Sequence, residues 1–279
     1  MHKKGTPTMG GISFIVATVL ALIIAMFIDS SNIKYYFLFI YTTISFSIIG
    51  YIDDMLIVVK KKNDGLAPRK KLMLQILFSI IFYVLVKFIY EDINYIYIPG
   101  LEYQLNISYL YMVFVVFWQT GFSNAVNLTD GLDGLATSVT IITTSTFALL
   151  AYKENNFPVF VFCLVLVGAL IGFLLFNKNP AKIFMGDTGS LALGGILAAI
   201  SIILHKEIAF ILIGLVYILE TLSVIIQVAY FKKTGKRIFK MSPLHHHFEL
   251  SGYGEVKTVY LFVIIALISS GVGYFLGVI

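Results

Sequence analysis

The chain has 279 residues, of which 59% are hydrophobic and 13% are charged, and its mean hydropathy is +0.92. A soluble domain carries about 25% charged residues, so the composition excludes an ordinary soluble protein and predicts a polytopic membrane protein. The net charge of +5 does not indicate nucleic-acid binding, because the basic residues gather on one side of the predicted membrane. The single cysteine, Cys163, excludes a disulfide within the chain.

The sequence predicts an all-α membrane domain with about nine transmembrane helices. A helix that crosses a bilayer needs about 20 mostly apolar residues. A polar stretch after the third span alternates and turns at Pro99-Gly100, which predicts a small outer β-hairpin near 94–105. No linker, low-complexity tract or convincing repeat interrupts the chain, so residues 1–279 are expected to form one domain. The predicted spans are 9–28, 35–52, 72–90, 108–124, 134–151, 157–176, 188–204, 208–230 and 256–277.

Basic residues set the predicted orientation. When alternate connections are counted from the N-terminus, sixteen of the 20 Lys and Arg residues fall on one side of the membrane. An excess of Lys and Arg marks the cytoplasmic side. The N-terminus and every polar cluster described below are therefore expected on the cytoplasmic face, and the C-terminus outside.

The most polar of these clusters is the stretch 123–136, which lies between two apolar spans. Asp130 and Asp133 each precede a glycine, and Asn124 and Asn127 add amide groups. Carboxylates at a membrane boundary are costly and are functional candidates by default. A helix N-cap would explain one aspartate, but it does not explain two Asp-Gly pairs.

Three further aspartates lie at the ends of spans on the same face. Asp53 and Asp54 end the second span and point about 100° apart on a helix, so one can face a cavity and the other a neighbour; acids that merely mark the membrane surface are the plainer explanation. Asp187, in Phe184-Met-Gly-Asp-Thr-Gly-Ser, is either an N-cap or a ligand for a hard cation. Without a cation, these carboxylates and the two in 123–136 would repel one another. A bound Mg²⁺ beside a phosphate-bearing ligand explains both the acidic and the basic groups.

Basic and histidine-rich motifs complete the cytoplasmic face. The segment 60–71 carries six basic residues, which mark the inner side and are also able to hold phosphates. Gly5-Thr-Pro-Thr-Met-Gly-Gly suits a helix start or, beside Lys3 and Lys4, a phosphate site.

A third motif, Ser242-Pro-Leu-His-His-His-Phe-Glu, lies in the long connection 231–255. Three consecutive histidines cannot all face one metal from a helix, which argues against zinc. Their imidazoles are able to bind pyrophosphate oxygens or carry protons, and a solvated loop is the alternative explanation.

Five of these motifs resemble, in their order along the chain, those of the polyprenyl-phosphate sugar-1-phosphate transferases. They are the motif that starts at Gly5, the pair Asp53-Asp54, the stretch 124–136, the motif that starts at Phe184 and the histidine motif that starts at Ser242. The first and last motifs favour the muramoyl-pentapeptide branch over the N-acetylglucosamine-type relatives. The resemblance implies a Mg²⁺-dependent transferase that moves phospho-MurNAc-pentapeptide from UDP-MurNAc-pentapeptide to undecaprenyl phosphate, giving lipid I and UMP for peptidoglycan synthesis. It also implies a multi-pass protein of the bacterial inner membrane with a cytoplasmic active site, and it leaves a homodimer open.

The resemblance implies roles for individual residues as well. Asp187 is expected to hold Mg²⁺, Asp53 to orient or deprotonate the lipid phosphate, and Phe184 to stack on uracil. Direct attack by the lipid phosphate is preferred over an aspartyl intermediate, because a metal and a phosphate nucleophile suffice. The residues with implied catalytic roles are Asp53, Asp54, Asp187, His245, His246 and His247. Those with implied substrate-binding roles are Lys3, Lys4, Lys71, Asn127, Asp130, Asp133 and Phe184.

One departure and two alternatives accompany this interpretation. The family usually has ten spans, so the first span is expected to be absent from this sequence. A transferase for UDP-N-acetylglucosamine is the alternative within the family. A transporter is the alternative outside it, but transporters place charges near the membrane midplane, and here only Glu220 is clearly intramembrane.

Overall fold

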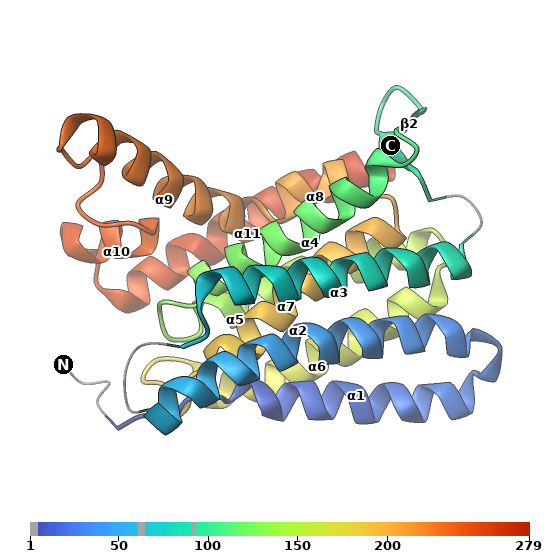
Figure 1. Cartoon of the computed structure of the whole chain (residues 1–279), viewed down its shortest axis with the longest axis horizontal. Coiled ribbons are helices and arrows are strands. Elements are labelled where there is room, and N and C mark those ends of the chain that lie inside the picture. Colours follow the sequence, from blue (N-terminus) through green and yellow to red (C-terminus); the bar gives the residue numbers. More distant parts are fainter. Residues whose placement is uncertain (1–4, 61–64, 91–92) are drawn as a thin grey trace.

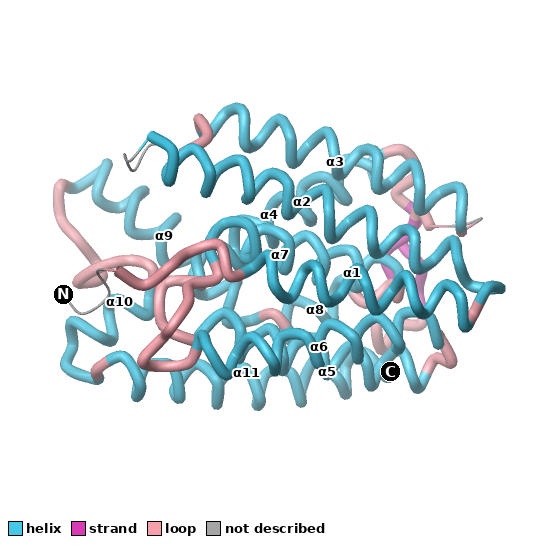
Figure 2. Tube along the Cα trace, turned by 90° about the horizontal axis from the view of Figure 1, so that it is seen from below, coloured by secondary structure: helices cyan, strands magenta, loops and turns pink. Residues whose placement is uncertain are grey.

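The computed structural model describes residues 5–60, 65–90 and 93–279 as a bundle of helices that run along the long axis of the molecule (Figure 1). The short helix α10 and the long loops lie at one end of the bundle, and the two strands lie at the other (Figure 2). The long helices are α1 (Gly11–Ile28), α2 (Ile33–Lys60), α3 (Pro68–Ile89), α4 (Leu110–Thr129), α5 (Leu135–Lys153), α6 (Phe157–Asn177), α7 (Gly186–Ile203), α9 (Leu215–Thr234) and α11 (Glu255–Val278). The shorter elements are η1 (Ser30–Asn32), β1 (Tyr95–Ile98), β2 (Tyr103–Asn106), α8 (Glu207–Ile213), α10 (Leu244–Phe248) and the π-helical turn η2 (Glu249–Tyr253).

Within the described residues, eight helices are long and apolar enough to cross a membrane. The remaining predicted span corresponds to α4, which has 20 residues and is therefore about 30 Å long at 1.5 Å per residue. Its hydropathy is lower because Gln119, Asn124 and Asn127 interrupt its apolar sequence. The polytopic all-α architecture predicted from composition is thereby confirmed.

The centre of the bundle is α7, 89% of which is buried inside the protein, whereas only 28% of α1 is buried. Small residues let its neighbours approach closely, as is common between membrane helices. A methyl group at Gly194 would collide with the backbone of Phe122 on α4, and one at Gly195 with the ring of Phe46 on α2. The middle of α7 is thus held between α2 and α4, the two helices that carry the predicted Asp and Asn motifs.

The eighth predicted span is broken into α8 and α9 at Gly214. A side chain at this position would meet the ring of Phe210. The backbone carbonyl of Ile213 at the break accepts hydrogen bonds from the hydroxyls of Thr143 at 3.5 Å and Ser270 at 3.3 Å. Polar backbone freed by a break inside a membrane must find such partners. The break directs α9 away from the bundle, toward the end that holds α10 (Figure 1).

The predicted hairpin near 94–105 is confirmed as β1 and β2, which pair antiparallel with Tyr95 opposite Asn106. Its turn includes Gly100 with a φ of +79°, in the left-handed region that glycine adopts readily. The hairpin lies at the end of the bundle opposite the polar motifs, so it does not take part in the site described next (Figure 1).

Candidate active site

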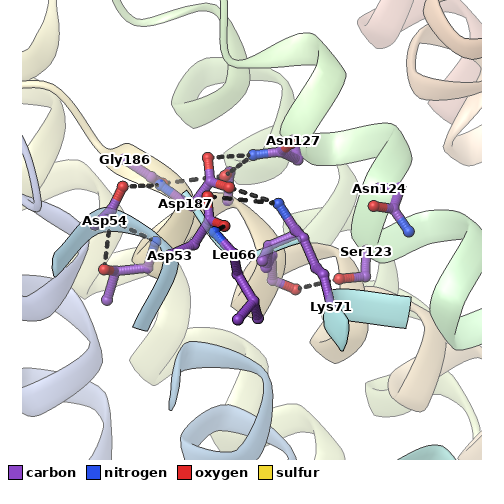
Figure 3. A network of polar contacts seen from close by, with 12 residues as sticks. Asp53, Asp54, Leu66, Lys71, Ser123, Asn124, Asn127, Gly186 and Asp187 are labelled. Carbon is purple, nitrogen blue, oxygen red and sulfur yellow. Dashed lines mark hydrogen bonds and ion pairs between the residues drawn. The ribbon is translucent and has the colours of Figure 1, made fainter. Parts of the chain in front are cut away.

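Asp187 lies in the first turn of α7 and receives hydrogen bonds from two other helices. Asn127 Nδ2 donates to Asp187 Oδ1 at 2.8 Å, and Lys71 Nζ donates to Oδ2 at 2.6 Å (Figure 3). The Asn127 amide also donates to Ser190 Oγ at 2.9 Å. Gly186 precedes Asp187 with a φ of +74°, which turns the incoming loop into the helix. Three residues singled out in the sequence, from α3, α4 and α7, therefore meet at one carboxylate.

Asp53 lies beside Asp187, and its carboxylate also reaches Lys71. Its Oδ1 accepts a hydrogen bond from the Leu66 amide at 2.6 Å, and its Oδ2 lies 3.9 Å from Lys71 Nζ (Figure 3). One ammonium group, with a side chain only 16% exposed, thus contacts the carboxylates of both Asp53 and Asp187. Because one positive charge faces two negative ones, the cluster formed by Lys71, Asp53 and Asp187 attracts a further cation.

Asp54 has a different environment from its neighbour. Its Oδ1 accepts a hydrogen bond from the Asp187 amide at 3.1 Å. Its Oδ2 accepts from the amide and the hydroxyl of Thr188 at 2.9 and 2.6 Å. Asp54 on α2 therefore caps the N-terminus of α7, where free amides and the positive end of the helix dipole favour a carboxylate. Any side chain at Gly50, one turn earlier, would collide with the backbone of Asp187.

A cavity of about 420 Å³ opens beside Asp187. Small-molecule pockets usually have volumes of about 300–1,000 Å³. Four of the residues with implied substrate-binding roles, Asn127, Asp130, Asp133 and Phe184, line it, together with part of the loop that precedes α7. The lining residues are Thr8, Asp54, Asn127, Asp130, Gly131, Leu132, Asp133, Asn177, Phe184, Gly186 and Asp187.

Asp133 also organises the loops around the cavity. Its Oδ2 accepts hydrogen bonds from Asn179 Nδ2 at 3.2 Å and from the Ala181 amide at 3.0 Å. Its own amide donates to Glu255 Oε1 at 2.8 Å, which ties the Asp-Gly loop to the start of α11. Asp133 is 6% exposed, whereas Asp130 ends α4 and is half-buried at the cavity wall.

The N-terminal motif pairs with the loop before α7. The Phe184 amide donates to the Pro7 carbonyl at 2.9 Å, and the Gly10 amide donates to the Phe184 carbonyl at 2.8 Å. This pairing fixes the backbone of Phe184 beside the cavity. The motif therefore has an observed structural role in addition to the predicted one. Lys3 and Lys4, predicted to bind phosphate, lie outside the described residues.

The three predicted histidines lie on α10, and one of them, His245, contacts a residue that lines the cavity. The ring of His245 is 1% exposed and lies against Gly131, so a side chain at Gly131 would collide with His245 Nε2. His246 and His247 are half-buried on the same short helix, and none of the three histidines lines the cavity itself. The structure therefore brings the histidine motif to the back of the Asp-Gly loop and not directly to Asp187.

Among the residues that the structure describes, no group of three or more His, Cys, Asp or Glu side chains is arranged to hold a metal ion. A Mg²⁺ site needs fewer protein ligands, because this ion keeps waters and binds through one or two carboxylates plus substrate phosphates. Asp53 and Asp187 form such a pair, since both face the Lys71 ammonium. The donor set is therefore compatible with Mg²⁺.

A series of buried hydrogen bonds between side chains aligns α3 with α4, and it was not predicted from the sequence. Gln75 Nε2 donates to Ser123 Oγ at 3.1 Å, and Asn124 Nδ2 donates to Gln75 Oε1 at 3.1 Å. Gln75 lies one turn after Lys71, so this series of bonds fixes Lys71 relative to Asn127. The detectable signal was a glutamine inside an apolar span. Thr188 and Ser190 were also given no role, although they belong to a quoted motif.

The helical bundle and the carboxylate-lined cavity define a multi-pass membrane protein with a polar ligand pocket at one end. Residues 36–205 match the family model described as glycosyl transferase family 4. Residues 3–15 match the model described as phospho-N-acetylmuramoyl-pentapeptide-transferase signature 1.

Curated relatives agree with both models. The whole chain aligns with 87% of a phospho-N-acetylmuramoyl-pentapeptide-transferase from Staphylococcus carnosus (strain TM300) at 53% identity. It aligns equally completely with proteins of the same name from Staphylococcus epidermidis (strain ATCC 12228 / FDA PCI 1200) and Staphylococcus aureus (strain MSSA476), at 52% and 51% identity. The chain belongs to the phospho-N-acetylmuramoyl-pentapeptide-transferase family within glycosyl transferase family 4.

Proposed function

We propose that this chain transfers phospho-MurNAc-pentapeptide from UDP-MurNAc-pentapeptide to undecaprenyl phosphate and releases UMP, which makes lipid I for peptidoglycan synthesis. The observation that carries the proposal is the contact of one ammonium, Lys71, with two carboxylates, Asp53 and Asp187, beside a cavity in a membrane bundle of this family. A lipid acceptor requires a site at the membrane, and a nucleotide donor requires a site open to water. A polar cavity at one end of an apolar bundle meets both requirements.

The cavity supports a uridine nucleotide as its occupant. Phe184 lines it with a half-buried aromatic ring, and Asn127, Asp130 and Asp133 supply amide and carboxylate groups around it. Stacking on an aromatic ring is worth about 1–3 kcal/mol per base, and the polar groups can hydrogen-bond the base and the ribose. The backbone pairing of Phe184 with Pro7 and Gly10 holds the backbone of this residue beside the cavity.

Mg²⁺ is the proposed cofactor, held by Asp187 with Asp53 beside it. When bound, it would neutralise the charge of the diphosphate and of the attacking phosphate. Lys71 supplies part of the same neutralisation from the protein itself, because its ammonium contacts both carboxylates. Lys71 is therefore proposed to contact a substrate phosphate when ligands separate it from one of the two carboxylates.

We propose direct attack for the reaction. An oxygen of the lipid phosphate forms a bond to the sugar-bearing phosphorus of the donor, and the bond from that phosphorus to UMP breaks. Asp53 orients the lipid phosphate or removes its remaining proton. Asp54 is proposed to act through structure, because its two oxygens are occupied by the first turn of α7.

The proposed location is the cytoplasmic face of the bacterial inner membrane, with residues 1–279 acting as one transferase domain. The distribution of Lys and Arg supports this side, because most of the basic residues that the structure describes lie at the end that carries the cavity. The homodimer that the resemblance leaves open is a further proposal, which native mass spectrometry of the purified protein tests.

Donor choice tests the proposed function. The purified protein in lipid nanodiscs is expected to release UMP from UDP-MurNAc-pentapeptide when undecaprenyl phosphate and Mg²⁺ are present, and to release none when the lipid is omitted. UDP-N-acetylglucosamine serves as the competing donor. Faster turnover of UDP-N-acetylglucosamine would assign the chain to the other branch of the family, and no turnover of either donor would contradict the proposal.

A further inference from the structure

Each of the three consecutive histidines on α10 has its Nδ1 atom occupied by a different partner. His245 and His246 face carboxylates, and His247 accepts a hydrogen bond from a backbone amide. In the order of the three histidines, the partners are Glu220 Oε2 at 3.2 Å, Glu249 Oε2 at 2.9 Å and the Lys240 amide at 3.1 Å. All three Nε2 atoms are thereby left for other contacts.

The first of these contacts is the most buried. Glu220 on α9 is 0% exposed and His245 is 1% exposed. Within the described part of the chain, Glu220 Oε1 and His245 Nε2 have no hydrogen-bond partner. Burying a carboxylate with one oxygen unsatisfied is unfavourable, and replacing a buried ion pair by apolar residues is often neutral or stabilising. Packing alone therefore does not explain this pair.

The free nitrogen of His245 faces the candidate active site. Its Nε2 lies against Gly131, which is between Asp130 and Asp133 in the loop that lines the cavity. The φ of Gly131 is outside the left-handed region, so the space needed by the imidazole, and not backbone strain, excludes a side chain there. Glu220 itself does not line the cavity, and its contact with His245 links it to this loop.

The partner of Nδ1 determines which nitrogen of a neutral imidazole carries the proton. A carboxylate only accepts, so Glu220 keeps the proton on His245 Nδ1 and leaves a lone pair on Nε2. The Lys240 amide only donates, so it keeps His247 Nδ1 unprotonated and places the proton on Nε2. These partners therefore favour opposite neutral tautomers in two residues of one motif.

We propose that Glu220 is a positioning residue of the transferase: it holds His245 in the Nδ1–H tautomer, with Nε2 directed at the Asp-Gly loop. This inference rests on the proposed function and adds to it a residue outside the pocket. In this role Glu220 sets the direction and polarity of the His245 contact that supports the loop and its ligand, whereas His247 is the fixed hydrogen-bond donor of the motif.

Two variants of Glu220 separate positioning from packing. Glu220→Leu removes the acceptor but fills the buried volume, and Glu220→Gln keeps an acceptor without the charge. Loss of a hydrogen-bond partner that orients a functional histidine usually changes activity about 10- to 100-fold. Glu220→Leu is therefore expected to lower kcat for UMP release within that range. The kcat of Glu220→Gln is expected to lie between those of the wild-type protein and Glu220→Leu. The matched control is Glu207→Gln, because Glu207 is equally buried but lies at the opposite end of the bundle, bonded to Tyr111.

A second measurement reads the tautomer without any substrate. In ¹⁵N-histidine-labelled protein at a pH where the rings are neutral, His245 is expected to show a protonated Nδ1, identified by the signal missing in His245→Asn. Glu220→Leu is expected to lose this pattern, while His247 keeps a protonated Nε2. A protonated Nε2 in wild-type His245 would overturn the inference, as would a Glu220→Leu protein that keeps wild-type kcat.

Gly131→Ala tests the same contact from the other side. Its methyl group must displace the imidazole, so kcat is expected to fall as it does in His245→Asn, and combining Gly131→Ala with Glu220→Leu should add little further loss. Fully multiplicative losses would show that the two positions act separately and would overturn the inference. If the wild-type protein turned over neither donor, the proposed function would fail, and the ¹⁵N spectrum would still decide whether Glu220 sets the tautomer.

Discussion

Lys71 Nζ lies 2.6 Å from Asp187 Oδ2, and this contact joins the first turn of α3 to the first turn of α7 across 116 residues of sequence. A charge-assisted hydrogen bond of this length is among the stronger polar contacts in proteins. The same ammonium reaches Asp53 at 3.9 Å, so one lysine organises both carboxylates that face the proposed phosphate site. The following predictions start from this group.

Lys71→Met is expected to lower kcat for UMP release by about 100-fold or more, because a preorganised charge aimed at a transferring phosphoryl group usually contributes that much. Methionine keeps the length of the side chain and removes the charge. Lys70→Met is the matched control, because Lys70 is adjacent and exposed and forms no ion pair with a described residue. Equal activity of the two variants would show that Lys71 has no special role.

Asp187→Asn is expected to abolish turnover and leave the protein folded. Asparagine keeps the size of the side chain and still pairs with Asn127, but it is a poorer ligand for Mg²⁺. UMP release is measured over a range of Mg²⁺ concentrations, and folding by thermal unfolding. A variant that turned over near the wild-type rate, with unchanged Mg²⁺ dependence, would contradict the proposed metal ligand.

Phe184→Ala is expected to weaken binding of UMP by about 1–3 kcal/mol, which is the usual contribution of one base–aromatic stack. The rate of the bound complex should change less, because stacking acts on the ground state and the transition state alike. Phe88→Ala is the control, since Phe88 is 85% exposed on α3 and does not line the cavity. Unchanged UMP affinity would show that Phe184 only packs against the loop.

Asp54→Ala is expected to act mainly on stability. It leaves the amides of Asp187 and Thr188 without their partner, and an unsatisfied buried donor usually costs about 1–3 kcal/mol. The midpoint of thermal unfolding should therefore fall. The single buried thiol, Cys163, offers a direct measurement, because a thiol-reactive dye reaches it only when the bundle opens. An unchanged midpoint would contradict the capping role.

The sequence was sufficient to predict the membrane class, the hairpin and the residues that gather at one end of the bundle. The length of each apolar run predicts a membrane-spanning helix. Carboxylates such as Asp130 and Asp187 are energetically costly at a membrane boundary, so their presence there indicates a functional role. One cavity is lined by Asn127, Asp130, Asp133 and Phe184, which agrees with the roles implied by the resemblance. Their individual functions stay predictions until they are measured.

The different roles proposed for Asp53 and Asp54 could not be predicted from the sequence. Helix geometry gives two directions for adjacent residues, but the partners come from segments far along the chain. Asp54 meets Thr188 across 134 residues, and Asp53 meets the Leu66 amide, which is 13 residues further along the chain. The partner of His245 could not be predicted from the sequence for the same reason, because tertiary packing places Glu220 beside it.

The role proposed for Asp53 can be tested by the pH dependence of activity. Asp53→Asn is expected to lose most activity near pH 6 and to recover part of it near pH 9, if proton removal is the main role of Asp53. The second pKa of a phosphate monoester is about 6, so near that pH much of the lipid phosphate carries a proton, whereas near pH 9 it is a dianion that needs no base. The measurement is kcat of the variant relative to the wild-type protein across this range. Asp187→Asn is the control and should show no recovery, because hydroxide does not replace a metal ligand. A loss in Asp53→Asn that did not depend on pH would assign Asp53 to orientation of the lipid phosphate, and a trapped phospho-aspartyl enzyme would overturn direct attack.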